Sequence, residues 1–448
     1  MRDVPAFNRG FLVEWYLRNR ARSKMLFDLV TDEAYYSRPI ALRHPIVFYD
    51  GHLPAFSFNT LLKRGLGRPS IDASLEGLFA RGIDPHESSG HGATQAHAAR
   101  GGWPTRDAVG RFADEADRRV LDALQHADLD QLGHALLDRR EAVFAILEHE
   151  AMHQETLLYM WHRLPFHQKQ PPAGYVAPLD GPVPRQEWIH VPAGRATLGL
   201  DRDSLVFGWD NERPATSASV NTFAIERHNV TNAAFLGFVE AGGYRDPRWW
   251  RPDDWTWLQT EDVRHPLFWE RHDGTWYWRG MFVLIPLPSS WPVYVSHAEA
   301  HAYAEWRGAR LATEAEFQRA AYGTTSAAER KYPWGDQAPT VERGAFDFSA
   351  WDPHAAGSHP AGRSAWGIDD LVGNGWEWTS TVFAPFTGFT PMPSYPEYSA
   401  DFFDGEHFVM KGASPVTARE LLRPTFRNWF RARYRYVYAT FRCARDAP

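Results

Sequence analysis

Two histidines, His149 and His153, stand four residues apart in the stretch LEHEAMHQETLLYMW, which begins at Leu147. On an α-helix, residues four apart lie on adjacent turns of one face, so both imidazoles can reach a single metal ion. At about 100° per residue, both histidines fall on the apolar stripe that also carries Ile146, and we expect them to point inward. A packed histidine that hydrogen-bonds a carbonyl group would show the same spacing, so spacing alone leaves the metal site open.

A third ligand has to come from another segment, and LRHPIVFYDGHLPAF offers His44 and His52. His52 follows a glycine and precedes apolar residues, as a ligand on a buried helix would, whereas His44 stands before a proline and is typical of a turn. We therefore prefer His52. Glu155 points away from the stripe of His149 and His153, so we expect it to lie behind the ligands or to face solvent.

The first third of the chain is expected to form the helices that position these residues. Apolar side chains at spacings of three and four predict helices over 107–127 and 129–164. The Gly-, Ala- and His-rich stretch 87–102 is interpreted as an exposed loop whose histidines are solvated. Beyond residue 187, short runs of Trp, Tyr, Phe and Val alternate with Gly, Pro, Asp and Asn, and only 231–242 and 296–308 are expected to be helical.

This change of texture predicts an α+β protein with two domains, because 448 residues exceed what one hydrophobic core usually supports. The proline-rich stretch QKQPPAGYVAPLDGPVPRQ is the expected linker. We place a helical bundle at 1–170, the linker at 171–187, and an irregular, aromatic-rich domain at 188–448.

Composition narrows the class of protein. The formal net charge is −7 and no stripe of Lys or Arg stands out, which gives no support to a nucleic-acid partner. No run of about 18 apolar residues predicts a membrane span, and residues 1–25 lack the apolar core of a signal peptide. One cysteine, Cys443, cannot form an intramolecular disulfide. These features favour a cytoplasmic protein without a membrane partner, and they set no oligomeric state.

The segment HEAMHQE, which begins at His149, and FYDGH around His52 together resemble the DinB-type helical bundle of the sulfoxide synthases of ergothioneine and ovothiol biosynthesis. The second half resembles the formylglycine-generating-enzyme fold, related to C-type lectins, that those synthases carry at the C-terminus. Matching stretches include FGWDNERP, VTNAAFLGFVEAGGY, LVGNGWEWTST and LLRPTFRNWF. The resemblance covers nearly the whole chain and implies a single non-heme iron(II), Fe(2+), held by His52, His149 and His153 at the domain interface. Geometry alone would equally permit zinc.

The family resemblance also implies roles for residues of the second half. Tyr395 and Tyr398, in MPSYPEYSADFF, match a Tyr-x-x-Tyr element whose first tyrosine donates a proton during the reaction with dioxygen, and Tyr398 would be its neighbour in the pocket. Trp429 matches the tryptophan that flanks the histidine-derived substrate. Its face can attract a trimethylammonium group by about 0.5–2 kcal/mol, which favours hercynine as the substrate.

Three positions depart from the family pattern. Phe430 and Tyr434 replace an aspartate and an arginine that hold the amino-acid end of the thiol donor in actinobacterial ergothioneine-type enzymes, and Met152 replaces a glutamine before the second histidine of the helix. An uncharged donor that stacks on aromatic rings fits these replacements better than gamma-glutamylcysteine. A selenosugar is such a donor, so the selenoneine synthase subgroup is our preferred interpretation.

Several alternatives stay open. An ergothioneine-type enzyme would join hercynine to cysteine or gamma-glutamylcysteine. An ovothiol-type enzyme would use histidine and cysteine, although such enzymes carry a methyltransferase domain for which we see no room after Arg445. A zinc-dependent DinB-type thiol transferase or hydrolase would need the three histidines but not Tyr395, and a sugar-binding module would need neither. Sulfatase activation requires a pair of cysteines, so Cys443 alone excludes it.

Overall fold

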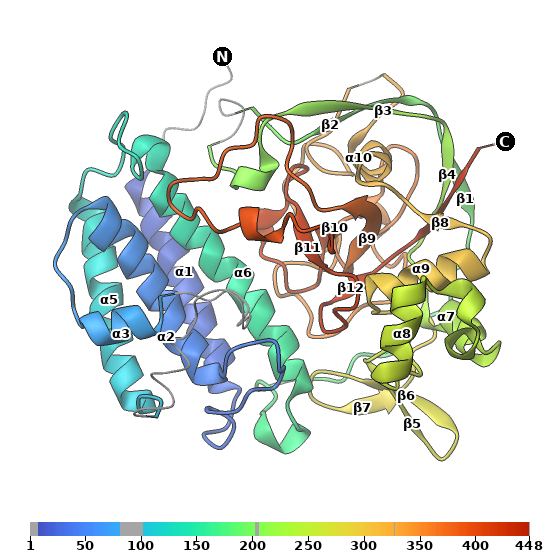
Figure 1. Ribbon diagram of the computed structural model, residues 1–448, viewed down its shortest axis with the longest axis horizontal. Helices are drawn as coiled ribbons and strands as arrows, with labels where there is room; N and C mark the ends of the chain where they lie inside the picture. Colours follow the sequence, from blue (N-terminus) through green and yellow to red (C-terminus); the bar gives the residue numbers. More distant parts are fainter. Residues whose placement is uncertain (1–7, 81–101, 202–205, 327, 448) are drawn as a thin grey trace. The chain divides into compact units, whose positions relative to one another are not determined.

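A computed structural model describes residues 8–80, 102–201, 206–326 and 328–447, and the chain forms two compact units (Figure 1). The helical unit comprises Met1–Tyr175 together with the short segment Pro393–Tyr395. The mixed unit comprises Val176–Met392 and Pro396–Pro448. The break after Tyr175 falls inside the proline-rich segment 171–187, which forms no regular element. Most of the expected loop 87–102 lies outside the described residues.

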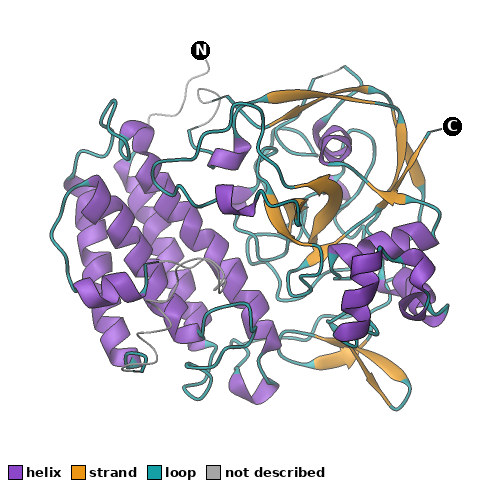
Figure 2. Ribbon diagram, viewed as in Figure 1, coloured by secondary structure: helices purple, strands orange, loops and turns teal. Residues whose placement is uncertain are grey.

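Long helices packed side by side make up the helical unit, as Figure 2 shows. Helices α1 and α2 each pack against both α5 and α6, which gives a four-helix arrangement. The elements in order are α1 (Arg9–Asp28), α2 (Ile46–Ser57), the π-helix η1 (Phe58–Gly65), α3 (Ala73–Leu78), α5 (Arg106–His126), η2 (Asp138–Arg140), α6 (Glu141–Arg163) and η3 (Phe166–Gln168).

Helix α6, which carries two of the candidate ligands, is shorter than expected. The prediction of a helix from residue 129 is wrong over its first turns, because α6 begins only at Glu141. Arg139 and Arg140 have φ values of 56° and 60°, which a continuous right-handed helix does not allow. Leu132, which extended the apolar spacing in the sequence, is 97% exposed and therefore belongs to no core-facing stripe.

Helix α2 is almost wholly buried and continues directly into the π-helix η1. Pro54 lies inside α2 and has no N–H to donate to the preceding turn, and the wider turns of η1 begin four residues later. His52 lies in the last two turns of α2, just before this change, and it is completely buried.

The mixed unit is built from short strands and short helices around an aromatic core. Its helices are α7 (Asn232–Glu240), α8 (Pro252–Thr260), α9 (His297–Trp306) and α10 (Glu314–Tyr322), with single turns η4 (Asp210–Glu212), η5 (Gly243–Arg245), η6 (Pro247–Trp249), η7 (Pro360–Gly362), η8 (Ala400–Phe402) and η9 (Arg419–Leu421). Its strands are β1 (Trp188–Val191), β2 (Gly194–Leu198), β3 (Thr216–Val220), β4 (Phe223–Glu226), β5 (Trp269–His272), β6 (Thr275–Arg279), β7 (Leu284–Pro286), β8 (Arg310–Leu311), β9 (Gly375–Val382), β10 (His407–Ala413), β11 (Asn428–Arg431), β12 (Ala439–Thr440) and β13 (Cys443–Asp446).

The strands form four separate sheets. Two of them have four strands each, in the orders β1-β4-β13-β8 and β11-β10-β9-β12, and the others are β2-β3 and β5-β6-β7. Pairing within the first sheet is antiparallel, with Ala444 opposite Ile225 and Cys443 opposite Leu311. Cys443 is fully buried there as an ordinary core residue.

Two helices of this unit were missing from the sequence-based expectation, which counted only 231–242 and 296–308. Helix α10 begins with a capping box in which Thr313 accepts from the N–H of Glu316 and Glu316 accepts from the N–H of Thr313. Helix α8 begins with Pro252, the residue best suited to a first helical position. Both signals are legible in the sequence, but their apolar spacing is weak because each helix is only 9 residues long.

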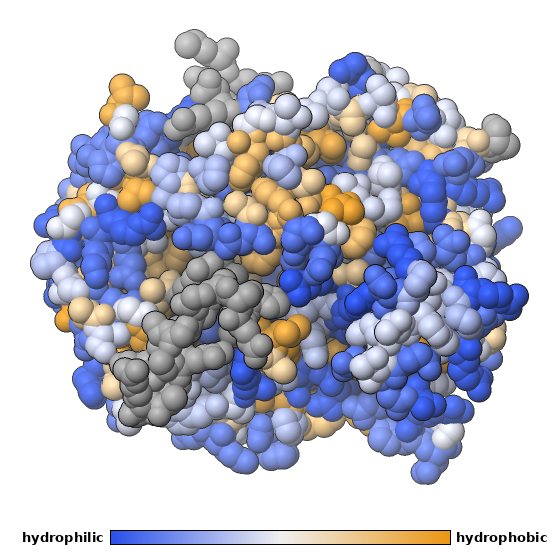
Figure 3. Space-filling model, in the orientation of Figure 1, coloured by the Kyte–Doolittle hydropathy of each residue, from blue (hydrophilic) through white to orange (hydrophobic). Residues whose placement is uncertain are grey.

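Aromatic side chains of the mixed unit point mainly inward. Every tryptophan within the described residues is at least partly buried, and the indole N–H of Trp278 and of Trp378 donates to Asp352 and to the Val295 carbonyl. The surface over α8 and β5–β7, at the lower right of Figure 3, is correspondingly hydrophilic. Among the described helices, none combines the length and the apolar character that a membrane crossing requires.

Candidate metal centre

Three histidines of the helical unit converge in its interior. His52 on α2 and His149 and His153 on α6 present one ligand nitrogen each, and these nitrogens all lie within 4.8 Å of one another. The Nε2 atoms of His52 and His149 are 3.3 Å apart. Two nitrogens bonded to one ion at about 2.1 Å stand roughly 3.0–3.4 Å apart for bond angles of about 90–109°. The pair therefore already has the spacing of two ligands on one ion.

The orientation of His52 is fixed by its other nitrogen. Its Nδ1 lies 2.7 Å from the carbonyl oxygen of Phe79, so Nδ1 carries the proton and donates it. Nε2 then keeps its lone pair, which faces the cluster. Phe48 stacks on the ring at 5.1 Å, and a backbone carbonyl behind a histidine is the usual support of a metal ligand.

The two histidines of α6 are held by ring contacts. His149 stacks on Phe56 with ring centroids 3.5 Å apart, and His153 lies 5.7 Å from the ring of Tyr49. The Nδ1 atom of His153 is buried and has no hydrogen-bond partner in the described part of the chain. A buried imidazole nitrogen without a partner costs free energy unless something coordinates it, so this donor set fits a metal ion.

Burial keeps all three imidazoles neutral near pH 7. Desolvation lowers the pKa of His52 to about 4, even though the hydrogen bond to the Phe79 carbonyl acts in the opposite direction. Desolvation and the neighbouring histidines lower the pKa of His149, and desolvation, His52, Arg43 and His44 lower that of His153. Neutral imidazole is the form that binds a metal ion.

Tyr395 belongs to the helical unit although it comes from the second half of the sequence. Its ring centroid lies 6.1 Å from that of His149 and 5.3 Å from that of Phe56. The segment that carries it is fixed by Arg64, whose guanidinium donates to the carbonyl oxygens of Pro393 and Ser394 at 2.9 and 3.0 Å. Tyr395 is therefore beside the histidine cluster on a tethered segment.

Glu141 tethers the same segment from the other side. Its carboxylate accepts from the N–H of Ser394 at 3.1 Å, and Ser394 is completely buried. Glu141 is the first residue of α6, which carries two of the histidines, and Arg64 is near the end of η1, which directly follows the helix of the third. The same part of the fold therefore also holds the Tyr395 segment. Neither anchor was identified from the sequence, since each acts over more than 250 residues of chain.

Three other residues near the candidate ligands, His44, Glu155 and Met152, lie outside the cluster. His44 is buried and stacks on Phe48 at 4.0 Å, outside the ligand cluster. Glu155 is only 9% exposed, so the expectation that it could face solvent is wrong, and it is not one of the clustered ligands. Met152 is partly buried and directly precedes His153 on α6.

Four further candidates, Tyr398, Trp429, Phe430 and Tyr434, lie in the mixed unit. Tyr398 stacks on Trp209 at 4.0 Å and meets Trp429 edge-on at 5.2 Å. Trp429 in turn stacks on Phe383 at 4.3 Å with nearly parallel rings. The structure thus brings Tyr398 and Trp429 together in one aromatic cluster.

Phe430 and Tyr434 form a separate stack, with ring centroids 4.9 Å apart and an interplanar angle of 16°. Phe430 is on β11, and the N–H of Tyr434 donates to the carbonyl of Arg431 in the turn that follows. The two aromatic replacements therefore contact each other. Trp209 and Phe383, which complete the other cluster, come from distant loops and gave no local signal in the sequence.

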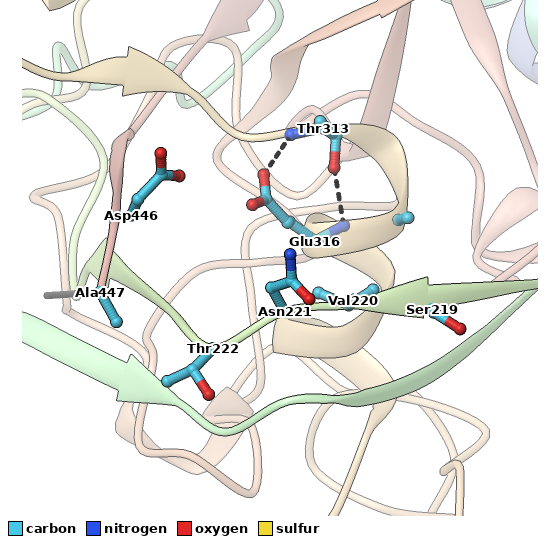
Figure 4. Close-up of a pocket in the computed structure, with 9 residues that line it drawn as sticks. Ser219, Val220, Asn221, Thr222, Thr313, Glu316, Asp446 and Ala447 are labelled. Atoms are coloured by element: carbon cyan, nitrogen blue, oxygen red, sulfur yellow. Dashed lines mark hydrogen bonds between the residues drawn. The ribbon is translucent and has the colours of Figure 1, made fainter.

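A cavity elsewhere in the mixed unit has no comparable chemistry. It measures about 440 Å³ and is lined by residues 219–222, Thr313, Glu316 and Asp446, as Figure 4 shows. The carboxylate of Glu316 accepts from the N–H of Thr313 at 2.8 Å and from Arg310, which also pairs with Asp446. These groups cap α10 and anchor strand β13 through the pair of Arg310 and Asp446.

Comparison with known proteins supports the assignment of both halves. Residues 16–157 match the DinB superfamily, and residues 177–447 match the sulfatase-modifying factor enzyme 1-like domain. A hercynine oxygenase of Mycolicibacterium smegmatis is 38% identical over 376 residues, which cover 76% of this chain and 86% of the relative. The hercynine oxygenase of Mycolicibacterium thermoresistibile is 37% identical and spans 100% of this chain and 97% of its own length. Ergothioneine biosynthesis protein 1 of Schizosaccharomyces pombe is 27% identical over the whole chain, which covers 57% of that protein.

A DinB-type bundle joined to a sulfatase-modifying-factor-like domain, with histidines clustered inside the bundle, defines a class of oxidative enzymes. The chain belongs to the family of hercynine oxygenases, which are ergothioneine-type sulfoxide synthases. The family resemblance and the α+β fold expected from the sequence motifs are confirmed.

Proposed function

We propose that this enzyme joins a chalcogen donor to the imidazole ring of hercynine in a reaction that requires iron(II) and dioxygen. The observation that carries the proposal is the cluster of buried His52, buried His149 and partly buried His153, with Tyr395 beside it. Relatives that span nearly the same length are named hercynine oxygenases, which supports hercynine as the acceptor.

His52, His149 and His153 would hold the iron through three neutral imidazoles. When bound, iron(II) supplies a site that keeps a thiol or selenol deprotonated near pH 7 and that reacts with dioxygen. The protein contributes imidazoles held by the Phe79 carbonyl and by ring contacts, and three imidazoles leave positions free for the substrates. The alternative of a zinc-dependent hydrolase is less well supported, since a hydrolase has no use for a tethered tyrosine at this place.

Tyr395 would donate the proton that the reaction with dioxygen needs. A phenol with a pKa of about 10 stays protonated at neutral pH and gives up its proton only to a strongly basic oxygen. The contacts of Arg64 and Glu141 with residues 393–394 hold this segment in place, so the phenol would already be positioned when the substrates bind.

Trp429 and Tyr398 would bind the trimethylammonium group of hercynine. The cluster that they form with Trp209 and Phe383 offers several π faces and edges within a few ångströms of one another. A quaternary ammonium cation is attracted to such faces without any hydrogen bond, and each contact contributes about 0.5–2 kcal/mol. A carboxylate-lined pocket would instead favour cations that donate hydrogen bonds.

We further propose that the chalcogen donor is a selenosugar. The supporting observation is that Phe430 and Tyr434, which stack on each other, replace the aspartate and the arginine that a charged donor would need. The thioether of Met152 likewise cannot donate a hydrogen bond, as a glutamine amide at this position of α6 would. A thiol donor such as gamma-glutamylcysteine is the competing possibility, because the relatives include proteins named for ergothioneine biosynthesis.

One experiment separates these donors. The full-length protein is reconstituted with iron(II) without oxygen, then exposed to air with hercynine and either a selenosugar, cysteine or gamma-glutamylcysteine, and products are identified by mass spectrometry. A hercynyl selenoxide adduct formed at least about 10-fold faster than any sulfur adduct supports the selenosugar. Sulfur adducts of equal or greater rate would overturn the donor assignment but keep the hercynine reaction. Absence of any hercynine adduct, with iron bound, would overturn the proposed function.

A further inference from the structure

A second pair of histidines, His354 and His359, faces a buried carboxylate in the mixed unit. The Nδ1 atom of His354 lies 3.4 Å from the Nε2 atom of His359. This is long for a hydrogen bond, whose usual N···acceptor distance is about 2.9–3.0 Å. It equals the separation of about 3.4 Å expected for two imidazole nitrogens bound to one tetrahedral ion at about 2.1 Å.

Asp370 lies behind this pair. Its Oδ1 atom is 3.8 Å from Nδ1 of His359, beyond hydrogen-bond distance, and the side chain is almost completely buried. The hydrogen-bond partner of His359 Nδ1 is Oγ of Ser358, at 3.1 Å. Oδ1 is itself buried and has no hydrogen-bond partner in the described part of the chain. A buried carboxylate with an unsatisfied oxygen is costly, and a nearby cation would offset that cost.

Among the described residues, no lysine or arginine supplies that cation. Within the described residues, His359 is the only basic side chain that lies within 4.0 Å of the Asp370 carboxylate. The neighbouring carboxylate, Glu377, is already paired with Arg442. The negative charge of Asp370 is therefore left to be balanced through His359.

The backbone around the pair is held before any ligand arrives. Asn374 anchors His354 by its main chain alone: the His354 N–H donates to Asn374 Oδ1 at 2.8 Å, and Asn374 Nδ2 donates to the His354 carbonyl at 3.0 Å. Asp370 Oδ2 accepts from the N–H of Gly357 at 2.6 Å. These bonds close the loop 354–374 and leave the imidazoles free to point at each other.

Access and protonation also fit a ligand pair. His354 is partly exposed, so water can complete the coordination of an ion there, whereas His359 is only 8% exposed. Burial, with a further contribution from His359, lowers the pKa of His354, which keeps its imidazole neutral near pH 7 despite the opposite effect of Asp370.

We propose that His354 Nδ1 and His359 Nε2 bind a divalent transition metal ion such as Zn²⁺. Ser358 Oγ holds His359 through its Nδ1 atom, and the buried Asp370 carboxylate supplies negative charge beside the site. Imidazole nitrogens suit Zn²⁺, Ni²⁺ and Cu²⁺, and a hydrogen-bond acceptor on the second nitrogen of a histidine is the common support of such a ligand. The site lies in the mixed unit, is separate from the cluster of His52, His149 and His153, and does not depend on the function proposed for that cluster. The role of the bound ion is structural, because it stabilises the loop 354–374, which leads into β9.

The test counts ions in full-length protein that has been stripped of metal and dialysed against Zn²⁺. The wild-type protein is expected to bind two equivalents, His149→Ala one, His354→Ala one, and the double variant less than about 0.2. His354→Ala is a mild change, because the bonds with Asn374 use only main-chain atoms of residue 354. His272→Ala is the matched control, since His272 is an exposed histidine that pairs with Glu270, and it should bind as much Zn²⁺ as the wild type.

A second readout separates a built site from a chance chelate. Zn²⁺ should raise the melting temperature of His149→Ala but not that of the double variant with His354→Ala. Asp370→Asn keeps an acceptor for Gly357 and tolerates the positive φ of 53°, and it should weaken Zn²⁺ binding by about 10–100-fold. Equal Zn²⁺ stoichiometry in His354→Ala and the wild type, or no Zn²⁺ bound by His149→Ala, would overturn the proposal and leave the pair as two hydrogen-bonded histidines.

Discussion

His149 is the proposed ligand whose removal tests the histidine cluster most directly. It lies between Phe56, on which it stacks, and His52, whose Nε2 is 3.3 Å from its own. His149→Ala should weaken iron(II) binding more than about 100-fold, because even the loss of a residue behind a ligand costs about 10–100-fold. Anaerobic titration with elemental analysis measures this.

The matched control is His44→Ala, which removes another buried histidine next to Phe48 that is outside the ligand cluster. This variant should keep one iron per chain. If His149→Ala bound iron as tightly as His44→Ala, the cluster would not be the iron site.

Tyr395 can be tested by removing a single oxygen atom. Tyr395→Phe keeps the ring that lies 5.3 Å from Phe56 but loses the phenolic proton. Formation of the coupled product should fall by about 10²–10⁴-fold, the usual contribution of a positioned acid, while iron binding stays unchanged. Product is quantified by mass spectrometry against oxygen consumed.

Tyr36→Phe serves as the comparison, because Tyr36 is a 47% exposed tyrosine of the same unit. It should leave the rate unchanged. An unchanged rate and unchanged coupling in Tyr395→Phe would assign Tyr395 to packing alone.

At the scale of single elements, helix α2 depends on the absence of a side chain at Gly51. A Cβ atom there would lie 2.4 Å from the ring of Phe79, the residue whose carbonyl orients His52. Gly51→Ala should therefore displace Phe79, cost about 1–3 kcal/mol of folding free energy, and weaken iron(II) binding by about 10–100-fold. Denaturant unfolding and iron titration measure the two effects.

Gly110→Ala on α5 is the matched substitution, because nothing lies within 4 Å of a Cβ at that position. It should raise stability by about 0.5–1 kcal/mol, since alanine is the better helix former. If Gly51→Ala behaved like Gly110→Ala, the contact between α2 and Phe79 would not be tight enough to orient His52.

The same elements show what the sequence could and could not predict. His149 and His153 could be assigned as a pair because four residues bring them together within one helix, which is a local property. The start of α6 could not be predicted, because the apolar spacing continues toward the N-terminus through Gly133 and Leu132. In the structure, Gly133 has a φ of 76° and Leu132 is exposed.

Contacts between residues far apart in the sequence could not be predicted from any local pattern. Arg64 contacts Ser394 across 330 residues, and Phe79 orients His52 through a backbone carbonyl that every residue possesses. Which carbonyl a side chain meets depends on the completed packing, so it is set by tertiary structure rather than by residue type. The tyrosine itself was identified only because the family resemblance singled out its motif.

At the scale of the whole molecule, the end of the chain closes the mixed unit. Strand β13 (Cys443–Asp446) pairs with both β4 and β8, so its residues are internal to a sheet. Arg442, just before it, pairs with Glu377 on β9 and donates to the carbonyls of Glu226 and Asp369. The unit therefore cannot complete its core until Arg442 and β13 have been placed.

Asp369 lies next to Arg442, which donates to its carbonyl, and its carboxylate makes the stability of the protein depend on pH. Its carboxylate accepts from Arg227 at 2.8 Å and from Arg363 at 2.5 Å, and it lies 3.2 Å from His228. Burial acts to raise the pKa of Asp369, but the hydrogen bonds from these three residues outweigh it and lower the pKa to about 2.

Because the folded pKa is below the value of about 3.9 for an unfolded chain, the folded state favours the ionised carboxylate. This stabilisation is fully present above about pH 4–5 and is lost as the pH falls through about 2. Asp369→Asn should therefore lower the free energy of unfolding at pH 7 by about 1–2 kcal/mol, after allowance for the screening of the partly exposed arginines. The difference from the wild type should shrink steadily between about pH 4 and pH 2.

Denaturant unfolding at a series of pH values measures this difference directly. Asp262→Asn is the control, because the pair of Asp262 and Arg264 is fully exposed and surface ion pairs contribute little. Asn also tolerates the φ of 49° at that position, so this variant should match the wild type at every pH. A stability gap for Asp369→Asn that stayed constant down to pH 2 would mean that lost hydrogen-bond geometry, rather than the charge of Asp369, accounts for the effect.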